Sequence, residues 1–411
     1  SGKSTLPCQI LLDLVVPMPA SFLGSISNMW RNIASNALTV FVVGLFLLGG
    51  LMTLLKSQYY SPGPLVQAIC LKVDAGSSMS KVAVQLGEVG AISSKRLFHI
   101  GVDYTGKAGD LKAGNFLISG GASMAQIADQ ITTNGRNTCG IEVIYRVGVT
   151  STTVLVRELD PTTNSYVEVV RFNPAVDTIP EVYSRVVVLD DTRVRVALAE
   201  GTTSWQIVKA LKSINILDGD ILEVPLEGSL APDSYEIKTG DMRFDVLSKM
   251  AVAQDLRLSE VWARRDENTP VKTIGELLIL ASIIEKETGV SDERFQVASV
   301  FVNRLNKGMP LQTDPTVIYG ITMGKGPLGR GLRKSELRRD TPWNTYVNRG
   351  LPPTPIANPG LASLQAALAP MDTDYIFFVA DGTGGHAFAV TLKEHNQNVV
   401  AWRKIEAERN R

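Results

Sequence analysis

The sequence predicts an α+β protein with one transmembrane helix near its N-terminus and a mixed α+β domain at its C-terminus. Three observations support this fold class. They are a long uncharged apolar run, a short strand–helix pattern that occurs three times, and strand-like segments between its second and third copies. With 411 residues, the chain is long enough for two or three domains, each with its own hydrophobic core.

The uncharged run is NALTVFVVGLFLLGGLMTLL, residues 36–55. A helix of about 20 residues spans the hydrocarbon core of a bilayer. The core of a signal peptide would be shorter and would precede a small-residue cleavage site, and a buried soluble helix of this length would normally have a polar face. We therefore expect one membrane anchor. Arg31 and Lys56 flank the run and barely decide its orientation.

A short pattern occurs three times without gaps: GSSMSKVAVQL from residue 76, GASMAQIADQI from residue 121 and GTTSWQIVKAL from residue 201. Each copy has a glycine, then serine or threonine two residues later, then apolar residues four apart. The pattern predicts a strand that ends at the glycine and a short helix whose N-caps are Ser78, Ser123 and Thr203. The preceding segments AICLKVDA, GNFLIS and VRVALAE have the apolar character of strands.

These strand–helix units resemble LysM modules, which hold glycans that contain N-acetylglucosamine in shallow grooves. We expect one such module over residues 64–135. The repeated positions are mostly caps and core residues, so a scaffold that binds no glycan is the alternative.

Residues 136–191 predict a small β-rich insert. The segments VLVRELD, YVEVVRF and RVVVLDD are strand-like, and the turn-rich PTTNS joins the first two. We find no residues in this insert that indicate chemistry.

Charge and cysteine content restrict the function classes. Acidic and basic residues balance at 41 each, which argues against nucleic-acid binding by the whole chain. A basic cluster at Arg330, Arg333, Lys334, Arg338 and Arg339 is expected to be a solvated face, with contact to an anionic polymer as the alternative.

The three cysteines, Cys8, Cys70 and Cys139, show no metal-binding spacing. Cys70 and Cys139 either pair in an oxidising compartment or remain two buried thiols.

The segment IGELLILASIIEKETG predicts a helix with a stop at Gly289 and two glutamates near its end. Glu287 continues the apolar stripe of Leu280, Ile283 and Ile284, whereas Glu285 lies over a smaller face. Burial beside an apolar wall raises the pKa of a carboxyl from about 4.3 toward neutrality, and such a group can act as a general acid.

The alternative is a helix end with two exposed glutamates, one of them paired with Lys286 or Arg294. Helical geometry alone favours this alternative.

Loops rich in hydrogen-bonding groups follow this helix. They favour the interpretation of Glu287 as a general acid over that of a helix end with two exposed glutamates. The first contains Gln312, Thr313 and Asp314, directly before Pro315. The later segments NTYVNRGLPPTPIANPG and DYIFFVADGTGGHAF are rich in glycine and proline, and such loops often carry binding and catalytic groups. They contain Asn344, Tyr346, Asn348, Asn358 and His386. Amides, hydroxyls and aromatic rings with few charges suit a neutral sugar better than a phosphate.

The runs SIIEKETGVSDERFQVASVFVNRL and GMPLQTDPTVIYG, with NTY, GLPPTPIANPG and FVADGTGGHAF, resemble the MltG/YceG family of endolytic murein transglycosylases. LEGSLAPDSYEI, residues 226–237, resembles a further stretch of that family. The resemblance covers roughly residues 194–411 and implies a YceG-like catalytic domain over residues 192–411. It assigns the catalytic role to Glu287, with Glu285 as the fallback.

The resemblance implies a lyase that cuts the β-1,4 bond between N-acetylmuramic acid and N-acetylglucosamine. Glu287 would act as both acid and base, and the product would carry a 1,6-anhydro end. Around it, the expected substrate-binding residues are Gln312, Thr313, Asp314, Asn344, Tyr346 and His386. No metal or cofactor is implied.

The implied surroundings are peptidoglycan glycan strands, the bacterial inner membrane and the peptidoglycan synthases, without nucleic acid. Residues 1–35 would be a cytoplasmic tail, 36–55 a single-pass anchor, and the remainder periplasmic. A cut near the membrane would limit the length of nascent glycan strands.

Two other functions stay open at this point. Asp314 could activate water across the bond from Glu287, which would make the protein a hydrolytic muramidase. A membrane-tethered scaffold that binds glycan without activity is the third hypothesis.

Overall fold

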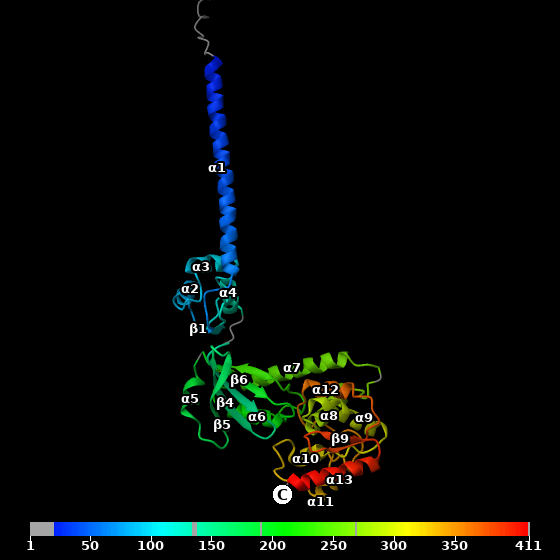
Figure 1. Ribbon diagram of the computed structural model, residues 1–411. Helices are drawn as coiled ribbons and strands as arrows, with labels where there is room; N and C mark the ends of the chain where they lie inside the picture. Colours follow the sequence, from blue (N-terminus) through cyan, green and yellow to red (C-terminus); the bar gives the residue numbers. More distant parts are fainter. Residues whose placement is uncertain (1–19, 134–137, 190, 268, 410–411) are drawn as a thin grey trace, which may run out of the picture. The chain divides into compact units, whose positions relative to one another are not determined.

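The computed structural model describes residues 20–133, 138–189, 191–267 and 269–409 (Figure 1). The chain divides into two compact units. Unit 1 comprises Ser1–Gln67, Asp74–Ala113 and Ile118–Asn134. Unit 2 comprises Ala68–Val73, Gly114–Leu117 and Gly135–Arg411. The mixture of helices and strands in the chain agrees with the predicted α+β class.

Helix α1 (Ala20–Tyr60) contains the predicted anchor. Its segment Thr39–Tyr60 has a mean hydropathy of 2.0, and among the described residues it is the one helix long and apolar enough to cross a membrane. Its apolar side chains are exposed to solvent, for example Val40 at 72% and Phe46 at 77%. This length and composition are compatible with a membrane anchor. Of the predicted tail, residues 1–19 lie outside the described residues.

The three predicted helix starts are confirmed, whereas each preceding strand ends three residues before its glycine. Helices α2 (Met79–Glu88), α4 (Met124–Thr132) and α6 (Ser204–Ser213) begin at these three caps, whose side-chain oxygens each accept the backbone N–H three residues later. The donor–acceptor distances are 3.3 Å for Ser78, 3.2 Å for Ser123 and 3.3 Å for Thr203. Each repeat glycine has φ between 71° and 77°, a region that favours glycine.

In unit 1, α3 (Lys95–Tyr104) packs against α2 and α4, and both α3 and α4 contact α1. Strands β1 (Ile69–Val73) and β2 (Gly114–Ile118) form a two-stranded sheet whose residues belong almost entirely to unit 2. Cys70 on β1 forms a disulfide with Cys139, with a Cα–Cα distance of 5.6 Å. The sequence left this pairing open, and the structure selects the disulfide.

Unit 2 contains a five-stranded sheet in the order β5–β4–β3–β6–β7. Its strands are β3 (Ile141–Val147), β4 (Thr152–Asp160), β5 (Ser165–Phe172), β6 (Arg193–Leu198) and β7 (Ser234–Ile237). Strands β3 and β6 are parallel, and the other neighbours are antiparallel. The strands of the predicted insert therefore share one sheet with strands of the predicted catalytic region.

The prediction of a strand at RVVVLDD was wrong. This segment contains the end of helix α5 (Glu181–Val186) followed by turns. Tyr183, Val186 and Val187 are all buried in the core below the sheet, which is the three- and four-residue spacing of a helix. The edge of β3 where another strand could pair is taken by β6.

Alternation along the strands gives the sheet one apolar and one charged face. Val143, Tyr145 and Val147 of β3 point into a core that includes residues of α6 and α7 (Arg243–Ala263). On the opposite face Glu142 is only 1% exposed and accepts ion pairs from Arg157 Nε at 2.6 Å and Arg195 Nε at 2.7 Å. The buried carboxylate is therefore compensated by charge.

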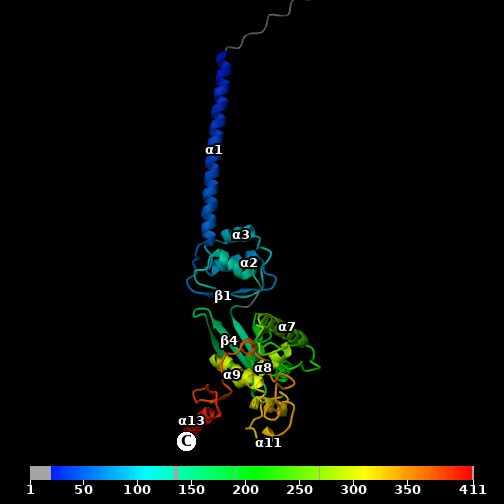
Figure 2. The ribbon, with the colours of Figure 1, turned by 90° about the vertical axis from the view of Figure 1, so that its right-hand side faces the viewer.

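The rest of unit 2 is mainly helical (Figures 1 and 2). Helix α8 (Ile274–Glu287) packs against α9, α10 and α12, and its apolar side chains belong to a second core. The other elements are η1 (Ser291–Glu293), α9 (Arg294–Asn306), α10 (Asp314–Thr322), α11 (Lys334–Leu337), α12 (Leu361–Leu368), β8 (Phe377–Ala380), β9 (His386–Ala389) and α13 (Leu392–Arg409).

The disulfide predicts a measurable stability difference. Cys70→Ser should lower the free energy of unfolding by about 2–4 kcal/mol, because the bond closes a loop with a sequence separation of 69 residues. Urea unfolding of the chain in detergent micelles, with and without reductant, checks this. Cys8→Ser is the control, and reductant should still destabilise it. Equal stability of Cys70→Ser and oxidised wild type would contradict the prediction.

Candidate active site

Glu287 is the last residue of α8, and the helical phase predicted for it is confirmed. Leu280, Ile283 and Ile284, which precede it on the same stripe, are all fully buried. The helix ends at Thr288, whose backbone turns to an extended conformation and whose hydroxyl accepts the Val290 N–H at 3.0 Å. The carboxyl of Glu287 therefore stands where an apolar helix leaves the core.

Burial dominates the electrostatics of Glu287. Desolvation raises its pKa from 4.5 to about 7, and the negative charge of Asp314 adds to this increase. A hydrogen bond from Thr313 acts in the opposite direction, as do the charges of His386 and Arg304. A carboxyl with a pKa near neutrality can donate a proton in one step and accept one in the next.

Thr313 holds the Glu287 carboxyl by a hydrogen bond between their side chains. Its hydroxyl donates to Glu287 Oε2 at 3.0 Å, and the residue is only 1% exposed. The backbone N–H of Thr313 donates to the Thr345 hydroxyl at 3.2 Å, which is 2.8 Å from the Thr316 hydroxyl. A chain of buried hydroxyls thus positions the donor.

Gln312 reaches the site through its backbone conformation. Its φ of 52° lies in the left-handed region, which costs a non-glycine residue about 1–2 kcal/mol. Its N–H donates to the Thr345 carbonyl at 3.0 Å, and its side chain is exposed. This turn precedes Thr313, whose side chain points to Glu287. The side-chain amide of Gln312 remains exposed to solvent.

Asp314 and Tyr346 form a hydrogen-bonded pair next to Glu287. The Tyr346 hydroxyl donates to Asp314 Oδ1 at 2.7 Å, and burial raises the pKa of Tyr346, with Asp314 and Glu287 as further causes. Asp314 is exposed at the start of α10. The pair therefore presents polar groups to solvent within electrostatic range of Glu287.

Asn344 does not fit the substrate-binding role expected of it. The residue is fully buried, and its Nδ2 donates to the carbonyls of Arg339 at 2.7 Å, Glu336 at 3.2 Å and Leu337 at 3.2 Å. Its Oδ1 accepts the Tyr346 N–H at 2.9 Å. Because these contacts occupy both ends of the amide, Asn344 holds the loop and presents no group to a ligand.

His386 lies on β9 and is held by Glu293. Its ring Nδ1 is 2.8 Å from Glu293 Oε2, and its backbone N–H donates to Glu293 Oε1 at 2.8 Å. The ring also meets Phe378 edge-on, with centroids 5.2 Å apart. His386 is half-buried, and its charge acts on Glu287.

Sequence reasoning missed Glu293 and Arg304. The Arg304 guanidinium is buried, donates to the carbonyls of Ile376 at 2.7 Å and Leu311 at 2.6 Å, and lowers the pKa of Glu287. The sequence contains a signal that could have identified Arg304. It follows Phe301 at helical spacing, so it places a cation on the apolar face of a helix.

Glu285, the alternative candidate for the catalytic acid, is held by internal polar contacts. Its Oε2 accepts the Gly360 N–H at 2.9 Å, its Oε1 lies 3.9 Å from Arg294 Nη2, and its side chain is 6% exposed. Glu285 is therefore held by a backbone N–H and faces an arginine, whereas the Glu287 carboxyl accepts a hydrogen bond from the Thr313 hydroxyl.

A buried polar cluster connects the α6 segment to this helical part. Burial raises the pKa of Glu227, whose carboxylate accepts the Ser204 N–H at 2.8 Å and lies 3.3 Å from both the Tyr319 hydroxyl and Asn358 Nδ2. Asn358 is fully buried and also donates to the Thr202 carbonyl at 2.9 Å. Asn358 is thus a structural connection.

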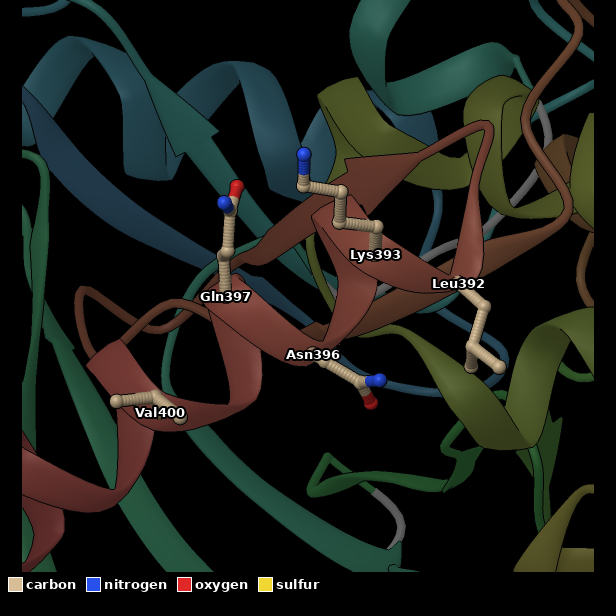
Figure 3. Close-up of a pocket in the computed structure, with 5 residues that line it drawn as sticks. All are labelled: Leu392, Lys393, Asn396, Gln397 and Val400. Atoms are coloured by element: carbon tan, nitrogen blue, oxygen red, sulfur yellow. The ribbon is translucent and has the colours of Figure 1, made fainter.

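Other surface features do not add to the site. A hollow on α13 is lined by Leu392, Lys393, Asn396, Gln397 and Val400, and the residues described around Glu287 are not among them (Figure 3). Within the described parts of the chain, no group of three or more histidine, cysteine, aspartate or glutamate side chains is arranged to hold a metal ion.

Comparisons relate the chain to known proteins. Residues 174–401 match the sequence model of the YceG-like family. A Bacillus subtilis (strain 168) protein named endolytic murein transglycosylase is 32% identical over 331 residues, 80% of this chain and 82% of that protein. A Streptococcus pneumoniae serotype 2 (strain D39) protein of the same name is 32% identical over 220 residues, 52% of this chain and 37% of that protein.

Among solved structures, the crystal structure of a yceG-like protein from Listeria monocytogenes is 25% identical, with a TM-score of 0.42. The match covers 80% of this chain and 98% of that one. The family match contains Glu287 and every residue described around it.

The raised pKa of Glu287 predicts how stability depends on pH. Between pH 4.5 and about 7 the native state holds a proton that the unfolded state releases, so wild-type stability falls as the pH rises through this window. Glu287→Gln carries no such charge. We expect it to gain about 3 kcal/mol of unfolding free energy relative to wild type between pH 4 and pH 8.

Urea unfolding at both pH values measures this difference, and Glu260→Gln on the exposed side of α7 is the control for loss of one carboxylate. Parallel pH dependences of Glu287→Gln and wild type would show that the Glu287 carboxyl is not desolvated.

Removal of the Thr313 hydroxyl should raise the pKa of Glu287 further, because that hydroxyl stabilises the carboxylate. For Thr313→Val we expect an increase of about one to two pH units, since a hydrogen bond to a charged group contributes about 1.5–3 kcal/mol. Carbon-13 NMR titration of glutamate carboxyls measures it, with Glu287→Gln to assign the signal. Thr313→Ser keeps the hydroxyl and should keep the wild-type value, whereas an unchanged pKa in Thr313→Val would contradict the hydrogen bond.

Proposed function

The chain belongs to the YceG-like family, and we propose on this basis that it is an endolytic murein transglycosylase, a lyase that cuts the glycan strands of peptidoglycan. The Bacillus subtilis relative with this name aligns with most of both chains. The observation that carries the proposal is the Glu287 carboxyl, which is desolvated, hydrogen-bonded to Thr313 and has a pKa of about 7.

A single carboxyl of this kind is sufficient for a lytic reaction. Hydrolytic glycosidases of the usual type need two carboxylates on opposite sides of the bond. In the lytic reaction, the C6 hydroxyl of the N-acetylmuramic acid residue is the nucleophile. Because it belongs to the reacting sugar, its proximity favours attack without an added water.

The protonated Glu287 would donate its proton to the glycosidic oxygen as the bond between N-acetylmuramic acid and N-acetylglucosamine breaks. The resulting carboxylate would take the proton of the C6 hydroxyl, whose oxygen then bonds to the anomeric carbon. The products are a strand with a free N-acetylglucosamine hydroxyl and a strand with a 1,6-anhydro end. Glu287 regains its proton, so the cycle closes.

The neighbouring residues support this cycle. Thr313 orients the carboxyl and stabilises its charged form. The exposed side chains of Gln312 and Asp314, with the partly exposed Tyr346 and His386, supply donors and acceptors for sugar hydroxyl and N-acetyl groups. Asn344 contributes indirectly, because it holds the backbone of Tyr346.

A hydrolytic muramidase is the second candidate, and the position of Asp314 favours it. Its charge acts on Glu287, and its carboxylate is exposed. Asp314 would then activate a water, and the product would carry a reducing muramyl end.

We also propose that α1 anchors the protein in the inner membrane, with unit 2 in the periplasm. Two observations support this: the apolar segment Thr39–Tyr60, and the Cys70–Cys139 disulfide, which suits an oxidising compartment. A LysM-like module over residues 64–135 would then hold glycan near the membrane. A cut there would limit nascent strand length close to the synthases.

Mass spectrometry of murein digested by the chain in detergent micelles tests the function. We expect 1,6-anhydro-muramyl ends from wild type and a loss of about 10²–10⁴-fold in rate for Glu287→Gln, the range for a general acid–base group. Reducing muramyl ends would instead indicate a hydrolase that uses Asp314. If wild type binds murein without cleaving it, the protein is a scaffold.

A further inference from the structure

Residues 330–349, which we name the basic arm, hold six basic and two acidic residues and a net charge of +4. The whole chain is neutral, so positive charge is concentrated here. The arm includes α11, which lies at the end of the helical part away from α7 in both views (Figures 1 and 2).

Internal contacts occupy both carboxylates of the arm. Arg330 donates to Glu336 through both terminal nitrogens, at 2.9 and 2.5 Å, and this contact lowers the pKa of Glu336 to about 2. The Arg333 N–H also donates to Glu336, and Asp340 accepts from Asn348 Nδ2 at 3.3 Å. The two acidic groups therefore stabilise the conformation of the arm through hydrogen bonds within it.

Apart from Arg333, whose charge acts on Glu336, the remaining cations of the arm form no ion pair with a described residue. Lys334, Arg338 and Arg339 are exposed, and none of them forms an ion pair with any residue that the structure describes. Arg349 at the end of the arm is exposed in the same way. A cluster of like charges without partners destabilises a fold slightly, so folding alone does not explain it.

Hydrogen bonds connect the backbone of the arm to residues of the candidate active site. Asn344 binds three carbonyls of the arm, including that of Arg339, and its Oδ1 accepts the backbone N–H of Tyr346. Tyr346 in turn donates to Asp314, whose charge acts on Glu287. The fully buried amide of Asn344 thus couples the position of the arm to the position of the reacting carboxyl.

We propose that the basic arm binds the carboxylates of the peptides that murein carries on its muramic acid residues, so that the enzyme prefers peptide-bearing strands. This inference rests on the proposed function. In intact murein the lactyl carboxyl of each muramic acid is bound in the amide link to the peptide, so the glycan backbone is neutral. Each peptide carries several carboxylates, and arginine and lysine recognise these as charged hydrogen-bond donors.

The distribution of the cations favours carboxylates over a phosphate. The four unpaired side chains are spread over exposed positions of the arm, which suits separate charges along a polymer. A phosphate site would instead gather donors around one concave backbone nest or one helix N-terminus of sufficient length. Helix α11 has only four residues.

The test compares the full chain in detergent micelles with the triple variant Lys334→Gln, Arg338→Gln, Arg339→Gln. Substrates are uncross-linked murein strands with their peptides, and the same strands after an amidase has removed the peptides. The stripped strands keep a single lactyl carboxylate on each muramic acid in place of the several carboxylates of a peptide. The control is Lys393→Gln, Arg403→Gln, Lys404→Gln, which removes three exposed charges from α13.

We expect the wild-type preference for peptide-bearing strands, as a ratio of kcat/KM values, to fall about tenfold in the arm variant and to stay unchanged in the control. Exposed charge pairs are individually weak, and the tenfold change expected from three of them together corresponds to about 1.4 kcal/mol. The wild-type preference should also weaken as salt is raised. An equal loss on both substrates, or no wild-type preference, would overturn the proposal.

A second comparison distinguishes carboxylate binding from phosphate binding by the arm. Cleavage of strands with and without a lipid pyrophosphate end is measured for wild type and the arm variant. A loss confined to lipid-ended strands would assign the arm to phosphate and overturn the proposal.

Binding without cleavage separates the arm from the proposed reaction. Sedimentation measures how Glu287→Gln, with and without the arm substitutions, binds intact and peptide-stripped strands. We expect the arm substitutions to weaken binding to intact strands more than binding to stripped strands. Equal binding to intact strands with and without the substitutions would overturn the proposal. This binding measurement tests the proposed role of the basic arm even if no anhydro ends form and the proposed function is wrong.

Discussion

The candidate active site depends on the exclusion of water from one carboxyl group at the end of an apolar helix. Leu280, Ile283 and Ile284 bury their side chains completely, and the continuation of the same stripe carries Glu287 out of the core only at the final residue of α8. A longer helix would move a later residue into this position. The site is therefore set by where α8 stops, and α8 stops where Thr288 turns extended.

The cost of burying this carboxyl is limited by hydroxyls rather than by a buried cation in direct contact. The Thr313 hydroxyl donates to Glu287, while Arg304 donates to the carbonyls of Ile376 and Leu311 and acts on Glu287 only through its charge. A direct salt bridge would pull the pKa of Glu287 well down. The observed arrangement leaves it near neutrality, where a group that must both give and take a proton is most effective.

Two buried asparagines organise the loops around this helix. Asn344 holds the basic arm and the backbone of Tyr346, and Asn358 joins the Glu227 cluster to the Thr202 carbonyl. Both lie in polar loop segments that suit sugar binding by composition, yet both are fully buried. Their role follows from the requirement that buried backbone groups find partners, which loops of this irregular shape cannot supply from regular secondary structure.

Local features of this protein were determined by the sequence itself. The apolar run, the three capped helices and the phase of Glu287 depend on neighbours within one or two helical turns, so spacing and capping predict them. The strand prediction for RVVVLDD was wrong because its β-branched residues favour a strand, whereas the spacing of the buried residues is that of a helix. Only the tertiary structure decided which loop residues meet. His386 and Glu293 are 93 residues apart, and Thr313 and Glu287 are 26 apart, so their contacts depend on how distant segments pack rather than on local spacing.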